Sequence, residues 1–307
     1  MADSLTMIEY SAHIKRPSTP LANNESGSIK LPHIEDHMRA LSNPIARSAL
    51  FTVGNRAQLR PNRKRFKIVA VSGVVMTYTG EALYQDDHDV FMSVCYIGSM
   101  HPLGTVVKFT AYALLKHLGW TPNPESYERL KAVLDRLSAT SLSVTFTAPG
   151  GTRVNYTGSL VRSFRWRSDG DEFALTQWEL LLEPEIVALF GRDSFTRLNW
   201  DIHKTLKNAG MAKWLHNFYS THQYPYAYSC ARVKELMASE AKSMAHFRAD
   251  LKKALEKLVK AGFLVAWVIT AEDRLQLVRV GFEDKVKMKY GAPELLIDDS
   301  EIDVDED

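Results

Sequence analysis

Residues 243–261 read SMAHFRADLKKALEKLVKA and predict one long amphipathic helix. At 100° per residue, its apolar side chains fall on one stripe, which we expect to face the core: Met244, Phe247, Leu251, Ala254, Leu255 and Leu258. The opposite side is basic and carries Lys242, His246, Ala249, Lys253, Lys257 and Lys260, flanked by Ser243, Arg248 and Lys252. Because such side chains neutralise phosphates and reach base edges, this side is typical of a DNA-reading helix. A solvated amphipathic helix is the alternative.

The segments around this helix favour the DNA-reading interpretation. A short helix is expected at Ser229–Ala238, before it, and a β-hairpin is expected after it. The hairpin joins Leu264–Thr270 to Leu275–Val280 through a polar turn. Helix, helix and hairpin in this order predict a winged helix, in which the second helix enters a DNA groove.

A similar order of elements precedes this one in the chain. A helix is expected after Thr79, a strand at Thr105–Thr110, and helices at Ala111–Gly119 and Ser126–Ala139. Two strands follow, Leu142–Thr147 and Arg153–Trp166, joined by a turn at Pro149, Gly150 and Gly151. The order then recurs, with a strand at Phe173–Leu182, a short helix at Glu185–Phe190, a strand at Phe195–Trp200 and a long helix at Ile202–His222. The two copies are about 115 residues apart.

These patterns predict an α+β protein with two tandem winged-helix domains. Residues 1–42 are rich in Ser, Pro, Asn and Gly and are expected to form a flexible arm. The first winged-helix domain is expected at 43–170, as a dimer interface or a contact to the DNA backbone. The second, main DNA-reading domain is expected at 171–290, and an acidic tail at 291–307.

The charge is unevenly distributed along the chain. The 307 residues carry a net charge of +2, from 38 Lys and Arg against 36 Asp and Glu. Eight of the acids lie in residues 291–307, which contain no Lys or Arg, so residues 1–290 carry +10. A basic body with an acidic tail suggests a polyanionic partner such as nucleic acid. The alternative is an ordinary solvated surface with a tail that increases solubility.

Two further basic segments are candidate DNA contacts. The helix of the first copy carries Arg129, Lys131 and Arg136, but acids lie between them, so only backbone contact or a protein interface is expected there. Residues 56–67 include Arg63, Lys64 and Arg65 and are expected to form a loop because Pro61 and Asn62 interrupt them. The alternation of Arg162, Phe164, Arg165, Trp166 and Arg167 suits either a nucleic-acid surface or a half-buried strand.

No catalytic, metal or cofactor motif is found in the sequence. The P-loop, HExxH and GxSxG patterns are absent, and no His-x-His pair accompanies a tyrosine as in a strand-nicking enzyme. Asp86-Asp87-His88-Asp89 is expected to be a solvated helical segment, because consecutive helical residues point in different directions. His203, His216 and His222 lack regular ligand spacing. We therefore expect no enzyme activity, no bound metal and no cofactor.

Other classes of protein are excluded by simple counts. Cys95 and Cys230 are the only cysteines, which excludes a disulfide framework, a zinc ribbon and an iron–sulfur site. No apolar run approaches 18 residues, and no secretory signal is found. We therefore expect a cytoplasmic protein with no membrane partner.

Eight short segments, in order over about residues 43–280, resemble one family. They are RSALFTVGNR (47–56), TYTGEALYQDD (77–87), PLG (102–104), SYERL (126–130), ATSL (139–142), SFRWR (163–167), FTRLNW (195–200) and AGFL (261–264). Together they identify the chain as similar to the TrfA-type plasmid replication initiators, with the arm and the tail outside the match.

The resemblance implies two winged-helix domains that bind repeated double-stranded sites, called iterons, at a plasmid origin. It also implies opening of an A+T-rich region, with that region's single strand as a further partner, and recruitment of the host initiator and the replicative helicase. Inactive dimers and active monomers are implied as well. By position, Lys242, Ser243, Arg248, Lys252 and Lys253 match the family's basic recognition helix. No QLxLF-like segment is found, so direct contact with the sliding clamp is not implied.

Two other functions remain open at the level of sequence. A winged-helix transcriptional repressor would use the same domains, and the resemblance favours the initiator. An enzyme such as a nickase or a primase would need catalytic residues that the sequence does not display.

Overall fold

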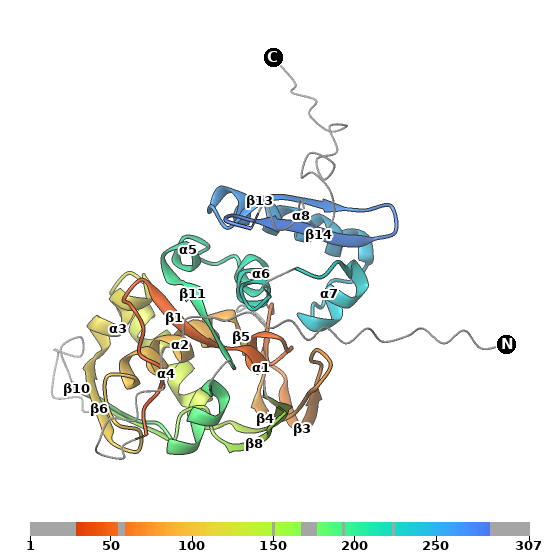
Figure 1. Cartoon of the computed structure of the whole chain (residues 1–307). Coiled ribbons are helices and arrows are strands. Elements are labelled where there is room, and N and C mark those ends of the chain that lie inside the picture. Colours follow the sequence, from red (N-terminus) through yellow and green to blue (C-terminus); the bar gives the residue numbers. More distant parts are fainter. Residues whose placement is uncertain are drawn as a thin grey trace.

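The structure is a computed structural model of the chain. It describes residues 29–54, 59–148, 151–166, 177–191, 194–222 and 225–282. Helices and strands alternate along these residues, so the protein has a mixed α+β fold (Figure 1). The expected arm up to residue 28, the tail at 291–307 and most of the turn at 149–151 lie outside the described residues.

The first core is built around three helices and a small sheet. The helices are α2 (Gln85–Gly98), α3 (Ala111–Leu118) and α4 (Pro124–Ser138). The antiparallel sheet has the order β6-β10-β9, formed by β6 (Val106–Thr110), β10 (Gln177–Leu181) and β9 (Ser163–Trp166). The predicted apolar face of α4 is confirmed, because Tyr127, Leu130, Val133, Leu134 and Leu137 are all buried.

A four-stranded antiparallel sheet, in the order β3-β4-β7-β8, packs on the same core. It contains β3 (Asn62–Ile68), β4 (Val74–Glu81), β7 (Ser141–Thr147) and β8 (Arg153–Gly158). Two expectations are corrected here. The basic segment 62–68 is an edge strand paired with β4, with a bulge at Arg65 (φ 48°), and not a loop. The expected strand Arg153–Trp166 is divided between β8 and β9, which belong to different sheets.

Shorter elements complete the first half of the molecule. They are β1 (Met38–Ser42), α1 (Asn43–Ala46), β2 (Phe51–Thr52), β5 (Leu83–Tyr84), the 3-10 helix η1 (Pro184–Phe190) and β11 (Phe195–Asn199). Strand β1 pairs with β11, and Leu31 and Ile34 are buried. The expectation of an arm extending to residue 42 is therefore wrong for residues 29–42, because their apolar side chains join the core.

The second core contains four helices and a three-stranded sheet. The helices are α5 (Trp200–Thr205), α6 (Gly210–Ser220), α7 (Cys230–Leu236) and α8 (Met244–Lys260). The sheet has the order β12-β14-β13, from β12 (Tyr228–Ser229), β14 (Arg274–Arg279) and β13 (Leu264–Ile269). The single helix expected at Ile202–His222 is two helices, because the chain turns after α5, with Lys207 at φ 45°.

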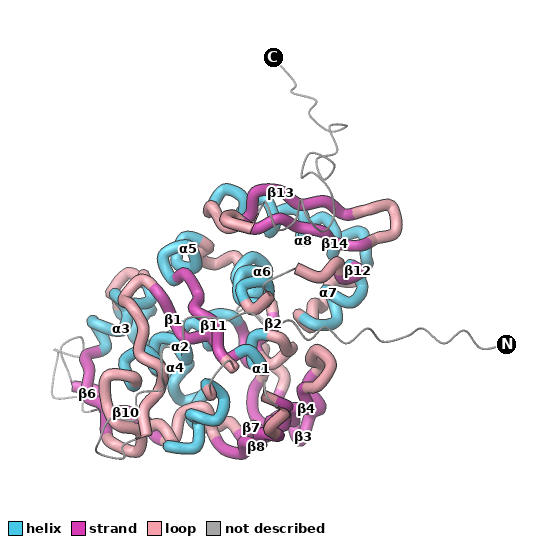
Figure 2. The backbone as a smooth tube through the Cα atoms, in the orientation of Figure 1, coloured by secondary structure: helices cyan, strands magenta, loops and turns pink. Residues whose placement is uncertain are grey.

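The apolar core divides between Trp200 and Leu206. The expected boundary after residue 170 does not coincide with this division. Strand β10 pairs with β6 and β9, and β11 pairs with β1, so both strands belong to the first half. Figure 2 shows the first half below α6 and the β13–β14 hairpin with α8 above it. No helix in the described ranges is long and apolar enough to span a bilayer.

Candidate nucleic-acid interface

Helix α8 forms where the sequence predicts it, with a capped start. The Ser243 hydroxyl accepts a hydrogen bond from the His246 backbone N–H at 3.2 Å, which satisfies one of the free amides at the helix N-terminus. After the helix, Gly262 adopts φ 74°, a left-handed conformation that glycine accommodates without steric cost. Phe247, Leu251, Ala254, Leu255 and Leu258 are buried, as the periodicity predicts.

The outward side of α8 is exposed and carries more bases than acids. Its lysines are Lys242, Lys252, Lys253, Lys257 and Lys260, and its acids are Asp250 and Glu256. The nearest acid to Lys253 is Asp250, at 3.8 Å and on an exposed surface, where an ion pair contributes little. His246 is exposed, and its ring nitrogen Nδ1 lies 3.0 Å from the Ser243 hydroxyl. The predicted basic face is therefore present at the surface.

Arg248 is engaged inside the chain. Its Nε and Nη2 atoms donate to the two carboxylate oxygens of Asp273 at 2.7 and 2.9 Å. Asp273 lies in the turn between β13 and β14, and the hydrogen bond from Arg248 lowers the pKa of its carboxyl. This bidentate pair joins the first part of α8 to the tip of the hairpin. Arg248 is predicted to read bases, but in the structure its guanidinium is bound to Asp273.

A groove of about 400 Å³ lies beside the basic face. Its walls are α8, the N-terminal end of α6, residues 239–241 and the Val53–Gly54 segment of the first half. Lys253 and Lys257 line it, together with Asp250 and Glu240. The groove therefore brings α8 next to the chain that leads into β3.

The basic residues of α4 point to a different partner. Arg129 lies 3.2 Å from Asp86, and Arg136 lies 2.7 Å from Asp87. Arg60 pairs with both aspartates, at 3.5 and 2.5 Å. Asp87 is fully buried, and its pKa is raised by burial and by Asp86, against the lowering effect of Arg136 and Arg60. These arginines satisfy buried carboxylates.

This pairing corrects one expectation and bears on another. The segment Asp86–Asp89 is not solvated, since all four of its side chains are buried. For α4, where backbone contact to DNA or a protein interface was expected, the surface counts against the DNA contact. The Lys131 ammonium lies 4.4 Å from the Trp166 ring centroid, and the exposed side of α4 carries Glu125, Glu128 and Asp135. Because these acids would repel phosphates, α4 is a poor DNA surface.

Strand β3 supplies the basic surface of the first half. It is an edge strand whose exposed residues include Lys64, Arg65 and Lys67, with the half-buried Arg63 stacked 4.4 Å from the Phe66 ring centroid. The Arg60 guanidinium, just before β3, stacks 4.1 Å from the Tyr84 ring centroid. Burial raises the pKa of the Tyr84 hydroxyl, and the charges of Arg60, Glu240 and Arg63 act on it. The start of β3 and the segment before α8 are therefore neighbours.

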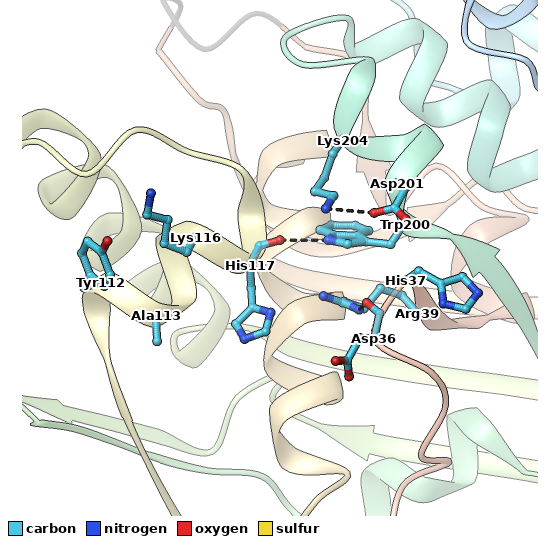
Figure 3. A pocket seen from close by; sticks show the side chains of 10 residues that line it. All are labelled: Asp36, His37, Arg39, Tyr112, Ala113, Lys116, His117, Trp200, Asp201 and Lys204. Atoms are coloured by element: carbon cyan, nitrogen blue, oxygen red, sulfur yellow. Dashed lines mark hydrogen bonds and ion pairs between the residues drawn. The ribbon is translucent and has the colours of Figure 1, made fainter.

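A second depression, of about 590 Å³, lies between β1, α3 and α5 (Figure 3). Its polar groups are paired with one another. Lys204 lies 3.0 Å from Asp201, and the Trp200 indole donates to the His117 carbonyl at 2.8 Å. The buried Arg39 guanidinium stacks on Trp200 and on Tyr96. None of the predicted site residues lies in this depression.

Metal and thiol chemistry find no support in the described ranges. They contain no group of three or more His, Cys, Asp or Glu side chains placed to hold a metal ion. Cys95 and Cys230 are free and buried, and burial raises the pKa of the Cys230 thiol to about 12. Neither sulfur therefore has the thiolate character of a nucleophile or a metal ligand.

Sequence reasoning identified α8 and missed the partners of the arginines. A helical wheel of α4 could have shown that its outward side is acidic. The residues farthest from the buried stripe are Glu125, Glu128, Ala132 and Asp135. Arg129 and Arg136 lie beside the buried stripe of that wheel. No pattern within the sequence identifies Asp273 as the partner of Arg248.

Comparisons with known proteins agree with the family resemblance. The chain is 28% identical over 271 residues to the plasmid replication initiator protein TrfA of Escherichia coli, covering 87% of this chain and 69% of that protein. The crystal structure of domains 2 and 3 of RctB superposes with a TM-score of 0.53 at 11% identity, over 77% of this chain and 96% of the RctB chain. That likeness supports the fold. The family model described as TrfA protein matches residues 7–278, and the chain belongs to this family.

Proposed function

We propose that this chain binds repeated double-stranded sites at a plasmid origin through α8 and β3. Replication initiation is the function of the plasmid initiator to which the chain is similar along 87% of its length. Beyond that similarity, we propose the iteron sites and the residues that contact them. The observation that carries it is the exposed lysine face of α8.

The arrangement of the second half supports a winged-helix mode of binding. Helix α6, strand β12, helices α7 and α8, and the hairpin β13–β14 follow in the order of that motif. In this scheme α8 enters the major groove and the hairpin is the wing, held to α8 by Arg248 and Asp273. His246 and Ser243, exposed at the N-terminal end of α8, would meet base edges.

The first half would contribute backbone contacts through β3 rather than α4. Its elements α2, β6, α3 and α4 follow the same order, with a sheet β6-β10-β9. However, the arginines of α4 are bound to Asp86 and Asp87, whereas Lys64 and Arg65 are exposed. Phosphates attract the available cations, so β3 is the better candidate.

The remaining steps of initiation extend the proposal. Origin binding would promote opening of the A+T-rich region, with contacts to its single strand, and recruitment of the host initiator and the replicative helicase. A monomer–dimer equilibrium would control the active form. The protein would perform these steps by binding alone, without catalysis.

A footprint on the DNA that flanks the gene tests the binding step. We expect protection of a repeated sequence, with an affinity that falls with salt at a logarithmic slope of about −5 if about six phosphates are neutralised. Protection of a single operator without repeats would favour the repressor.

Maintenance of a plasmid tests initiation itself. The gene and its origin are placed on a plasmid that cannot otherwise replicate, and stable transformants are expected. Loss of that plasmid, despite a normal footprint, would also support the repressor. Supercoiled plasmid incubated with the protein and magnesium should stay intact, and cleavage would indicate an enzyme.

A further inference from the structure

Helix α6 lies between the two halves of the molecule (Figure 1). It also buries polar side chains against the first half. Its apolar residues, including Leu215 and Phe218, belong to the second core. On the other side, Lys213, His216 and Asn217 are buried at helical spacing. Lys213 and Asn217 face buried polar residues of α2, and His216 faces the buried His203 of α5. The junction between the halves therefore contains a buried polar seam, beside apolar contacts in which Val53, Val69 and Val71 of the first half pack on the second core.

One ion pair and two histidines form the main line of this seam. The Asp89 carboxylate of α2 pairs with the Lys213 ammonium through Oδ2. Its Oδ1 atom lies 2.8 Å from His203 Nε2, and His203 Nδ1 lies 3.1 Å from His216 Nδ1. Asp89, His203 and Lys213 come from three different helices, and each is less than 9% exposed. Lys213, Asp89, His203 and His216 are called the seam network below.

The bonding pattern fixes the protons of both histidines. An ionised Asp89 only accepts, so His203 donates from Nε2, and its Nδ1 then accepts from the Nδ1–H of His216. The remaining nitrogen of His216, Nε2, has no hydrogen-bond partner. Burial lowers the pKa of both histidines, in agreement with neutral rings. The network thus holds one positive and one negative charge, with both rings neutral.

A second line of hydrogen bonds runs parallel to the seam network. Asn217 donates from Nδ2 to the Gln85 side chain at 3.1 Å, and the same atom lies 3.1 Å from His88 Nδ1. Gln85 in turn donates to the Phe51 carbonyl at 2.6 Å. Residues of α6, α2 and β2 are therefore connected directly by hydrogen bonds.

A buried polar seam restricts movement more strictly than an apolar one. Apolar side chains can slide past one another while they remain in contact, since dispersion and hydrophobic attraction have little directionality. Hydrogen bonds and ion pairs have one geometry, and a small shift would leave the buried charge of Asp89 or Lys213 without its partner. This penalty favours a single placement of the two halves.

We infer that the seam network is a positioning device that sets the distance between α8 and β3 and thereby the spacing of the two contacts on DNA. The inference rests on the proposed function for its DNA part. The ion pair connects α2, whose Asp86 and Asp87 hold Arg60 just before β3, to α6, which packs against α8. The network therefore lies on the path between the two basic surfaces.

The variant that tests this inference removes both charges together. Asp89→Leu with Lys213→Met replaces the ion pair by apolar side chains of similar size, a change that buried pairs often tolerate in stability. Asp89→Ala alone would strand the Lys213 charge and is expected to unfold at a lower temperature, so it serves as a comparison. The matched control is Arg162→Met with Glu183→Gln, an ion pair wholly within the first half.

The first measurement does not depend on DNA. Spin labels on Thr77→Cys in β4 and Glu256→Cys in α8 report the distance between the halves, and both positions are exposed. Cys95 and Cys230 are buried and would not be labelled. We expect one narrow distance distribution for the parent and the control, and a distribution at least about twice as wide for the double variant. A double variant as narrow as the parent would overturn the inference.

The second measurement uses the DNA site defined by the footprint, with one to several base pairs inserted between the contacts of α8 and β3. The parent should lose affinity sharply with insertion, and the double variant should lose several-fold less. A wide distance distribution with an unchanged insertion profile would also overturn the positioning role. If the parent binds no specific site, the proposed function fails, while the distance measurement still decides whether the network holds the two halves.

Discussion

At the scale of single residues, charge alone does not identify a DNA contact. Lys253 and Arg248 lie on the same helix, five residues apart, and both matched the basic pattern. Lys253 is exposed beside the groove and forms an exposed ion pair with Asp250 at 3.8 Å, which contributes little. Arg248 holds Asp273 through two hydrogen bonds. The two residues therefore differ in how strongly a carboxylate of the same chain holds them. Asp273 binds the Arg248 guanidinium through two hydrogen bonds, whereas the ion pair of Lys253 is exposed.

Lys253→Ala is expected to weaken binding to all DNA sequences alike. Loss of one phosphate contact should reduce the salt slope by about one unit. Titrations at several salt concentrations, with specific and unrelated duplexes, measure both quantities. Lys108→Ala on β6, an exposed lysine near Glu179, is the control and should change neither. A loss confined to the specific duplex would contradict a phosphate contact.

His246→Ala is expected to relax the base preference of binding. The His246 side chain lies exposed near the N-terminal end of α8, the part of a recognition helix that meets base edges. Affinity for the best site should fall by about 1–3 kcal/mol, with little change for unrelated DNA. Binding competitions with single-base variants of the site test this. Equal losses on every duplex would make the base-reading assignment wrong.

At the scale of elements, the two copies of the helical pattern use their basic residues differently. On α8 the lysines point away from the core, whereas on α4 the arginines lie against Asp86 and Asp87 of α2. The exposed stripe of α4 is left acidic. The basic surface of the first half is the edge strand β3 instead. The sequence identified its basic residues as candidate DNA contacts, but it predicted a loop and not a strand there.

Arg136→Ala is expected to destabilise the protein without changing its DNA contacts. Removal of this partner leaves the fully buried Asp87 with fewer compensating charges, and breaking a buried pair costs about 3–5 kcal/mol. Chemical denaturation measures the loss, and the salt slope of DNA binding should be unchanged at a temperature where the variant is folded. A lower slope with full stability would restore α4 as a DNA surface.

Lys64→Ala combined with Arg65→Ala is expected to weaken DNA binding without destabilising the protein. Both side chains are exposed on β3, so stability should change by less than about 0.5 kcal/mol, as for most surface substitutions. The salt slope should fall by about two units because two phosphate contacts are lost. The same titrations with the pair Glu125→Ala and Glu128→Ala on α4 provide the control. An unchanged slope would remove β3 from the interface.

At the scale of the whole molecule, acid should weaken the fold through its buried histidines. Burial lowers the pKa of His88 to about 3 and that of His222 to about 4, and it also lowers the pKa of His203 and His216. Histidines of the unfolded chain bind protons near pH 6.5, so unfolding takes up protons below that pH. Stability is therefore present above pH 6.5 and is lost as the pH falls toward the folded-state values.

His88 and His222, whose pKa values are lowered to about 3 and about 4, should each lower the free energy of unfolding by about 1.4 kcal/mol between pH 7.5 and 5.5, and His203 and His216 act in the same direction. Asp87 changes the free energy of unfolding in the opposite direction as the pH falls, because its pKa is raised in the folded protein. Urea denaturation at the two pH values measures the net difference. His222→Gln should make that difference smaller by about 1.4 kcal/mol. An unchanged difference in the His222→Gln variant would show that His222 is not buried as a neutral ring.

Helices α3, α4, α7 and α8 and most strands could be predicted because their signals are local. The helix expected after Thr79 begins only at Gln85, because Val74–Glu81 and Leu83–Tyr84 are strands. The apolar period of residues 243–261 and the cap at Ser243 specify α8 within about one residue at each end. The capping and period of α4 do the same for residues 124–138. The exceptions have local causes too. The chain turns at Lys207 and forms a bulge at Arg65, both with positive φ. Lysine and arginine rarely adopt positive φ, so the residue types do not predict these conformations.

By itself, the sequence determined the family, the α+β composition and the basic face of α8, since each depends on residues close together in the chain. Only the tertiary structure decided that the first core extends to Trp200, that β3 replaces α4 as the basic surface, and that α6 joins the halves through Asp89. These features depend on partners that are far apart in sequence, such as Asp89 and Lys213, 124 residues apart. A periodic pattern shows which side of a helix is buried, but the identity of the facing charge depends on how the chain folds back.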